Sequence, residues 1–169
     1  MMLHRKNHWY IDSSKCIIAT FAICGFVLAN ATGEQILVEV TPVILTTPTP
    51  DPVNPRPIAP DSTALVGAGE DFFVEVWASN VDGARPGLAC VSVDLLYPTT
   101  YMDALPPIQD GPLFPITPVT TVFDDAAGLV DDCSSCQGAP AIEFLGVEEW
   151  VMIDRVRMNA IAGLLVGTG

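Results

Sequence analysis

The sequence predicts an all-β protein, a sandwich of two sheets that follows an N-terminal export signal. Apolar and polar residues alternate with a period of two in several short segments, which is the pattern of strands that bury one face. Glycine and proline turn signals separate these segments, as at Asp110-Gly111-Pro112. The only helical candidate, Thr99 to Leu105, is short. Many short strands with such corners favour a two-sheet sandwich.

Residues 1–31 have the pattern of a secretory signal peptide. Arg5, Lys6 and Lys15 precede an apolar run from Cys16 to Ala29, and Ala29-Asn30-Ala31 is the small-x-small triplet that signal peptidase cleaves. The run is too short for a permanent membrane helix. We therefore expect cleavage after Ala31, a secreted or cell-surface product, and no membrane insertion of the mature chain.

The composition of the exported part excludes several function classes. Both histidines and both lysines lie in the signal, and removing Asp12 from the 20 acids and Arg5, Lys6 and Lys15 from the 7 bases leaves nineteen acids and four arginines. Nucleic acid and anionic membranes are therefore poor partners. Without histidine, the usual general base and the Ser-His and Cys-His pairs are missing.

Only carboxylates remain for catalysis in the exported part. The candidates for a glycosidase-type pair are Glu143, Glu148, Glu149 and Asp154. Glu148 and Glu149 would point to opposite sides of an extended chain. We expect no enzymatic activity and assign no catalytic residue.

The exported residues divide at about position 62. Residues 32–62 contain a first strand, near Ile36 to Val40, and then seven prolines between Thr41 and Asp61. Proline has no backbone donor and pushes its predecessor to extended geometry. The proline-rich stretch is either a semi-rigid polyproline-type connector or a long loop that crosses one sandwich. Residues 63–169 form the predicted sandwich.

Three longer strands are expected within the sandwich. In Phe72 to Ala78, one face carries Phe72, Val74, Val76 and Ala78, and the other carries Phe73, Glu75 and Trp77. The second strand runs from Leu88 to Tyr97 and the third from about Val151 to Ala160. Shorter extended pieces are expected at 64–66, 118–123 and 141–144.

Three of these segments resemble the cohesin-like domain family. Val66 to Ala78 is similar to its Val-x-x-Gly-(Glu/Asp) turn and early strand, Gly87 to Tyr97 to the strand that follows, and Trp150 to Gly163 to a strand that ends in an Ala-Gly corner. The resemblance implies a jelly-roll-type sandwich related to bacterial carbohydrate-binding modules.

The same resemblance implies a non-catalytic module for extracellular attachment. Its partner would be an extracellular protein of the dockerin type or, alternatively, a polysaccharide. Family members usually continue with further strands after the corner, so a vacant sheet edge is expected unless Ile36 to Leu45 fills it. A truncated product without independent function is a further alternative.

The mature chain has three cysteines, Cys90, Cys133 and Cys136. Cys133-Ser134-Ser135-Cys136 lacks the βαβ context of a redox centre and the further ligands of a zinc site. We expect a structural disulfide, either within this motif or from Cys90 to one of its cysteines, and one remaining thiol. A bond from Cys90 would close a loop of more than forty residues and stabilise by roughly 3 to 4 kcal/mol.

Four aspartates bracket Gly128 in a predicted loop: Asp124, Asp125, Asp131 and Asp132. Dense carboxylates on a turn are the ligands of a hard cation such as Ca²⁺, although the spacing fits neither an EF-hand nor a dockerin loop. The alternative is a solvated acidic loop. No other cofactor is expected.

The last candidate is a binding surface on the sheet face that the alternation marks as exposed. Phe73, Glu75 and Trp77 share this face of one strand, and Arg155 and Arg157 occupy the equivalent face of the late strand. Aromatic rings beside charges occur in sugar-stacking platforms and in protein-docking faces. Alternatively, the N-terminal segment covers this face.

Overall fold

The computed structural model describes residues 22–26, 38–50, 56–63, 65–80, 90–117, 120–136, 149–162 and 164–165. These residues form strands and connecting loops and contain no helix, so the predicted all-β class is confirmed. The described part of the chain accordingly holds no helix that could cross a membrane.

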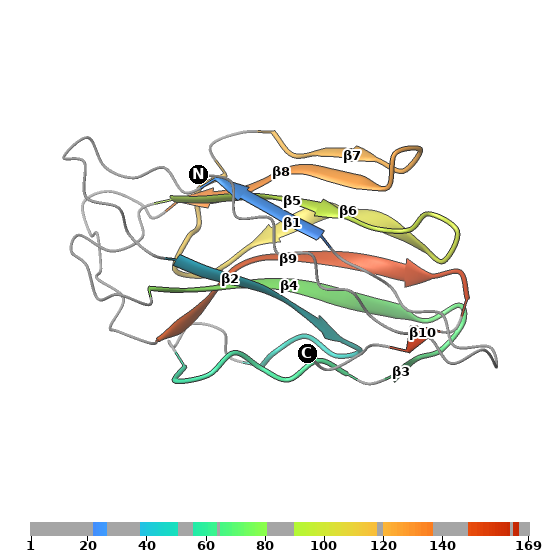
Figure 1. The fold of residues 1–169 in the computed structure, drawn as a ribbon, viewed down its shortest axis with the longest axis horizontal. Helices are drawn as coiled ribbons and strands as arrows, with labels where there is room; N and C mark the ends of the chain where they lie inside the picture. Colours follow the sequence, from blue (N-terminus) through green and yellow to red (C-terminus); the bar gives the residue numbers. More distant parts are fainter. Residues whose placement is uncertain are drawn as a thin grey trace.

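Two antiparallel sheets make up most of the described chain (Figure 1). The first, here called the β4 sheet, has the order β2 (Val38–Leu45), β4 (Asp71–Asn80), β9 (Trp150–Ala160) and β6 (Met102–Asp110). The second, the β5 sheet, has the order β1 (Ala22–Phe26), β5 (Cys90–Leu96), β8 (Leu129–Cys136) and β7 (Val122–Asp124). A small ribbon pairs β3 (Leu65–Val66) with β10 (Leu164–Leu165).

The hydrophobic core contains residues from both sheets. Phe72, Val74 and Val76 of β4 are fully buried, and the alternation in the sequence places these three residues on one face of the strand. The β5 sheet contributes Val91, Val93 and Leu95 to the same cluster, each at most 2% exposed. Burial of these apolar surfaces is the main favourable term that holds the two sheets together.

The three longer predicted strands are confirmed as β4, β5 and β9, and the short piece at 64–66 corresponds to β3. Of the piece expected at 118–123, residues 122 and 123 lie in β7. Residues 118–119 of that piece, and all of the piece expected at 141–144, lie outside the described residues. The first strand pairs along β4 as β2, so it fills that edge of the sheet.

The helical prediction for Thr99 to Leu105 is wrong, because this segment enters β6. Met102 and Ala104 are buried and pair with Ala160 and Met158 of β9. Tertiary pairing therefore overrides the local preference. The pairing with β9 is interrupted between Leu105 and Gln109, where the Pro106-Pro107 peptide bond is cis.

The described part of the proline-rich stretch lies against the β4 sheet rather than leading away from it. The Ser62 hydroxyl accepts a hydrogen bond from the Ile44 N–H at 3.0 Å, and Arg56 and Trp150 form an isolated antiparallel bridge. The described residues of this stretch therefore contact the β4 sheet, as residues of a loop that crosses one sandwich would.

Candidate functional site

The predicted aromatic platform on the β4 sheet is not an open surface. Trp77 and Glu75 are both 0% exposed. Trp77 packs with Val43 and Met152, and Ala59 of the proline-rich stretch packs against this cluster. The Arg56 guanidinium lies 5.7 Å from the centre of the Trp77 ring, within the range of a cation–π contact. The period-two alternation gave the correct faces but could not show that a second layer covers one of them.

Glu75 is the centre of a buried polar network beneath this layer. Its carboxylate accepts hydrogen bonds from the Thr49 N–H at 2.9 Å, the Thr49 hydroxyl at 2.7 Å and the Trp77 indole N–H at 3.0 Å. Arg155 approaches it to 2.7 Å and also donates to the Thr49 carbonyl. Glu75 and Arg155 thus anchor residue 49 on the sheet and are not free to contact a partner.

The open end of this sheet face carries a second charge pair. Arg157 donates to Asp71, and both side chains are partly exposed. The Arg157 hydrogen bond, followed by the one from Asn159, lowers the pKa of Asp71. Phe73, which pairs with Arg157, is half-buried. Of the five residues predicted to form one surface, Glu75 and Trp77 are fully buried, Phe73 and Arg155 are half-buried, and Arg157 alone is exposed.

The four predicted calcium ligands are divided between two places. Asp124 caps a turn by accepting from the Ala127 N–H at 3.0 Å, and Asp125 accepts a hydrogen bond from the Tyr97 hydroxyl. Burial and this bond raise the pKa of Tyr97. Asp131 and Asp132 lie on β8 instead, so the expected single acidic loop is not formed.

Asp131 and Asp132 meet Asp94 of β5, and one carboxylate oxygen from each lies within 4.8 Å of the others. The pairing of β5 with β8 shifts between Val93 and Leu95, which leaves Asp94 opposite two residues, as in a β-bulge. Asp132 has φ of 56° and donates its N–H to Asp94 at 3.2 Å. Asp94 was missed because nothing in its alternating strand distinguishes it from an ordinary exposed position.

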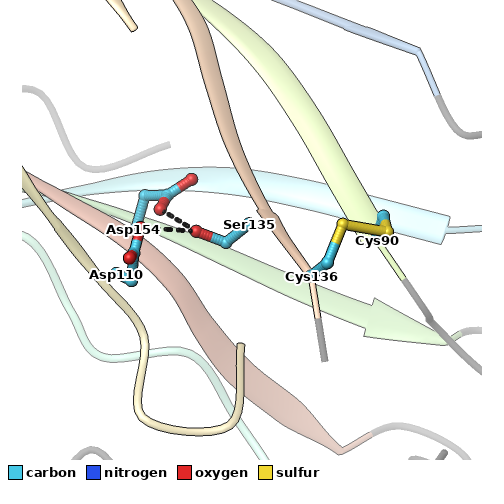
Figure 2. Close-up of a disulfide and its surroundings, with 5 residues drawn as sticks. All are labelled: Cys90, Asp110, Ser135, Cys136 and Asp154. Atoms are coloured by element: carbon cyan, nitrogen blue, oxygen red, sulfur yellow. Dashed lines mark hydrogen bonds between the residues drawn. A yellow bond between two sulfur atoms is a disulfide. The ribbon is translucent and has the colours of Figure 1, made fainter. Parts of the chain in front are cut away.

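A disulfide joins Cys90 to Cys136, which are paired across β5 and β8 (Figure 2). This decides between the expected pairings and leaves Cys133 as the free thiol of the described chain. Cys133 is 0% exposed, and burial, together with Asp154 and the three-aspartate cluster, raises its pKa. It is therefore a poor nucleophile in the folded protein.

A chain of polar side chains crosses between the sheets beside this disulfide. The Ser135 hydroxyl on β8 lies 2.5 Å from Asp154 Oδ1 on β9 and 3.0 Å from Asp110 Oδ1 on β6 (Figure 2). The Thr117 hydroxyl lies 2.8 Å from each of the two carboxylate oxygens of Asp110. Asp154 is 0% exposed, and its Oδ2 has no hydrogen-bond partner among the described residues.

Thr117 also lines an open groove of about 460 Å³ beside β6 and β7. Its walls combine apolar rings and side chains with hydroxyls, and they are formed by Pro106, Pro107, Ile108, Thr117, Thr120, Thr121 and Phe123. Ile116 and Val122, close by in the sequence, are 46% and 53% exposed. A surface of this kind can contact aliphatic side chains and accept or donate hydrogen bonds, but it presents no titratable group for catalysis.

No protein-family model, no curated protein and no solved structure matches this chain.

Proposed function

We propose that the exported chain is a non-catalytic β-sandwich module that docks a partner protein outside the cell. The observation that carries this proposal is the chemistry of its exposed apolar side chains. Within the described part, the large apolar residues that are exposed are all aliphatic: Ile58, Leu65, Leu96, Ile116, Val122 and Ile161. Contiguous exposed apolar surface is typical of protein contact surfaces, and Ile116 and Val122 directly adjoin in sequence Thr117 and Thr121, which line the groove beside β6 and β7.

The same observation weighs against a polysaccharide platform as the main function. Sugar stacking uses the open face of an aromatic ring. The described aromatic side chains are buried or half-buried, and Trp77, the residue predicted to stack, is fully buried. Polysaccharide binding therefore stays the alternative, with Phe73 beside Arg157 as its best remaining site.

The proposed module would be a sandwich of the cohesin-like kind. Two four-stranded antiparallel sheets, with β2 on the outer edge of β4, are consistent with a jelly-roll-type sandwich of that kind. The acidic character of the chain, with a formal charge of −13 including the signal, favours partners with a basic contact surface.

Capture experiments with the secreted protein test the proposal. Immobilised protein is exposed to the culture medium of the same organism, and in parallel is applied to insoluble cellulose and other glycans. Specific capture of a protein, reduced by Ile116→Asp or Val122→Asp, supports docking. If no protein is captured, and the chain is instead retained on a glycan and Arg157→Ala weakens that retention, polysaccharide binding would replace docking as the function.

A further inference from the structure

The edge of β5 is occupied by a strand that the sequence predicts to be removed on export. β1 runs antiparallel to β5, in blue in Figure 1, and its partners extend from Ala22 opposite Leu96 to Phe26 opposite Ser92. The whole of β1 lies within the predicted signal, residues 1–31. Cleavage after Ala31 would leave β5 as an edge strand and deprive the backbone groups of residues 92–96 of their neighbour.

A vacated edge of this kind is a template for an added strand. Its unpaired N–H and C=O groups favour pairing with another extended chain, and partner proteins use such edges for recognition. The three-aspartate cluster stands on the outer face beside this edge, because Asp94 is the residue that pairs with position 24 of β1. Residues directly opposite on antiparallel strands have Cβ atoms about 5 Å apart, on the same face.

We propose that in the exported protein the β5 edge binds an extended segment of a partner protein, antiparallel to β5, with an arginine or lysine at the position that Cys24 occupies here. This inference rests on the proposed docking function and on signal cleavage. It adds a second contact site to the one tested at Ile116 and Val122, because the β5 edge is opposite β7 in the order of the sheet. It also specifies the geometry of that contact and the charge of the partner.

The charge follows from the surroundings of Asp94. Its carboxylate lies among those of Asp131 and Asp132, and their mutual repulsion is relieved by a cation. Arg155 pairs with Glu75 and Arg157 pairs with Asp71, so neither of these arginines neutralises this cluster. A basic side chain at position 24 would face Asp94 and, through it, the negative charge of the whole cluster.

The neighbouring positions specify apolar side chains. Leu96, 40% exposed on the same outer face, pairs with position 22. Leu95 and Val93 face the core and pair with positions 23 and 25. A second copy of this chain fits poorly as the donor, since residues 32–169 contain no lysine and few arginines among many acids.

Two forms of the protein and two synthetic peptides test this inference. The processed protein is purified from the medium, with its N-terminus determined by sequencing, and the unprocessed full chain serves as the form with an occupied edge. The labelled peptides span positions 20–28, one with Cys24→Arg and one with Cys24→Ser. Binding is measured by fluorescence polarisation at low and high salt, for wild type and for Asp94→Asn.

We expect the arginine peptide to bind processed wild type roughly fivefold more tightly than the serine peptide at low salt, a ratio set by charge pairing. High salt and Asp94→Asn should both bring the ratio close to one. The unprocessed chain should bind neither peptide well.

Several results would overturn the inference. A processed protein that retains residues 22–26 removes the vacant edge, and equal binding of both peptides to wild type removes the charge recognition. If the peptides bind the unprocessed chain as tightly as the processed protein, the β5 edge is not their binding site. A stable homodimer that excludes the peptide would make a second copy of the chain the occupant of this edge. Failure of all peptides together with successful partner capture would reject this site while leaving the docking function intact.

Discussion

Ser135 on β8 and Asp154 on β9 connect the two sheets through a contact of 2.5 Å inside the core. The Ser135 hydroxyl has one hydrogen, and Asp110 Oδ1 lies 3.0 Å from the same oxygen. One hydroxyl cannot donate to both carboxylates. Both contacts of the Ser135 hydroxyl are hydrogen bonds when Asp154 is a neutral acid that donates to Ser135 and Ser135 donates to Asp110.

The surroundings of Asp154 also favour its protonated, neutral form. Burial raises the pKa of Asp154 to about 7; the Ser135 hydrogen bond opposes the rise, and the charge of Asp110 adds to it. The ionisable groups that face Asp154 are Asp110 from β6 and the Cys133 thiol from β8. Neither supplies a positive charge that would stabilise an ionised Asp154.

The first prediction concerns the dependence of stability on pH. A carboxyl whose pKa is higher in the folded state than in the unfolded state binds more protons when the protein is folded. The stability that Asp154 contributes is therefore present below about pH 4 and is lost as the pH rises to about 7. Asp154→Asn, which resembles the neutral acid, should flatten this decline and raise the free energy of unfolding at pH 8. Urea unfolding of both proteins from pH 4 to 8 measures it.

Asp103→Asn, a partly exposed position on β6, is the control for loss of one negative charge. Parallel pH profiles for wild type and Asp154→Asn would show that Asp154 is ionised in the folded protein throughout this range.

The second prediction concerns the disulfide. The Cys90–Cys136 bond closes a sequence separation of 46 residues, for which the chain-entropy model gives a stabilisation of about 4 kcal/mol. The double variant Cys90→Ala, Cys136→Ala should lose stability of this order, as measured by chemical denaturation.

Thiol labelling gives an independent check on the same cysteines. In processed native protein a maleimide should label no cysteine, because Cys133 is buried, and in denaturant it should label one. Labelling of three cysteines in unreduced, denatured protein would mean that the disulfide is absent.

The third prediction concerns Trp77. Because its side chain is fully buried with Val43 and Met152, Trp77→Ala should cost about 3–5 kcal/mol of stability and should not act as a selective binding variant. Phe73→Ala, at the half-buried neighbouring position, should cost clearly less. A stable, well-folded Trp77→Ala protein with weakened ligand binding would restore the platform interpretation.

The fourth prediction concerns the Glu75–Arg155 pair. Removing one member of a buried, hydrogen-bonded pair leaves the other uncompensated, typically at about 3–5 kcal/mol. We expect Arg155→Met to destabilise strongly, and the double variant Glu75→Gln, Arg155→Met to lose less than the sum of the single changes. Additive losses in thermal unfolding would show that the two side chains are not coupled.

The fifth prediction concerns the three aspartates. Their carboxylates lie within 4.8 Å of one another, so Asp131→Asn should raise the melting temperature at low salt, with a smaller gain at high salt. If the aspartates bind calcium, millimolar calcium should raise the melting temperature of wild type but not that of Asp131→Asn. A melting temperature unchanged by calcium would remove that hypothesis.

The sequence alone determined the fold class and the inward faces of the main strands. Period-two alternation places Phe72, Val74 and Val76 on one side whatever the rest of the chain does, because side chains alternate along any strand. It also restricted the disulfide to three cysteines. Cys133 and Cys136 could not be distinguished, since the partner of Cys90 depends on the register between β5 and β8.

Only the tertiary structure decided what covers each face and which distant residues meet. Trp77 has the sequence pattern of an exposed residue, yet Val43, Ala59 and the guanidinium of Arg56 pack around it. Asp94 joins Asp131 and Asp132 through a bulge, and Ser135 reaches Asp154 across the core. These are contacts between segments far apart in the chain, and a local pattern of alternation contains no information on which segments become neighbours.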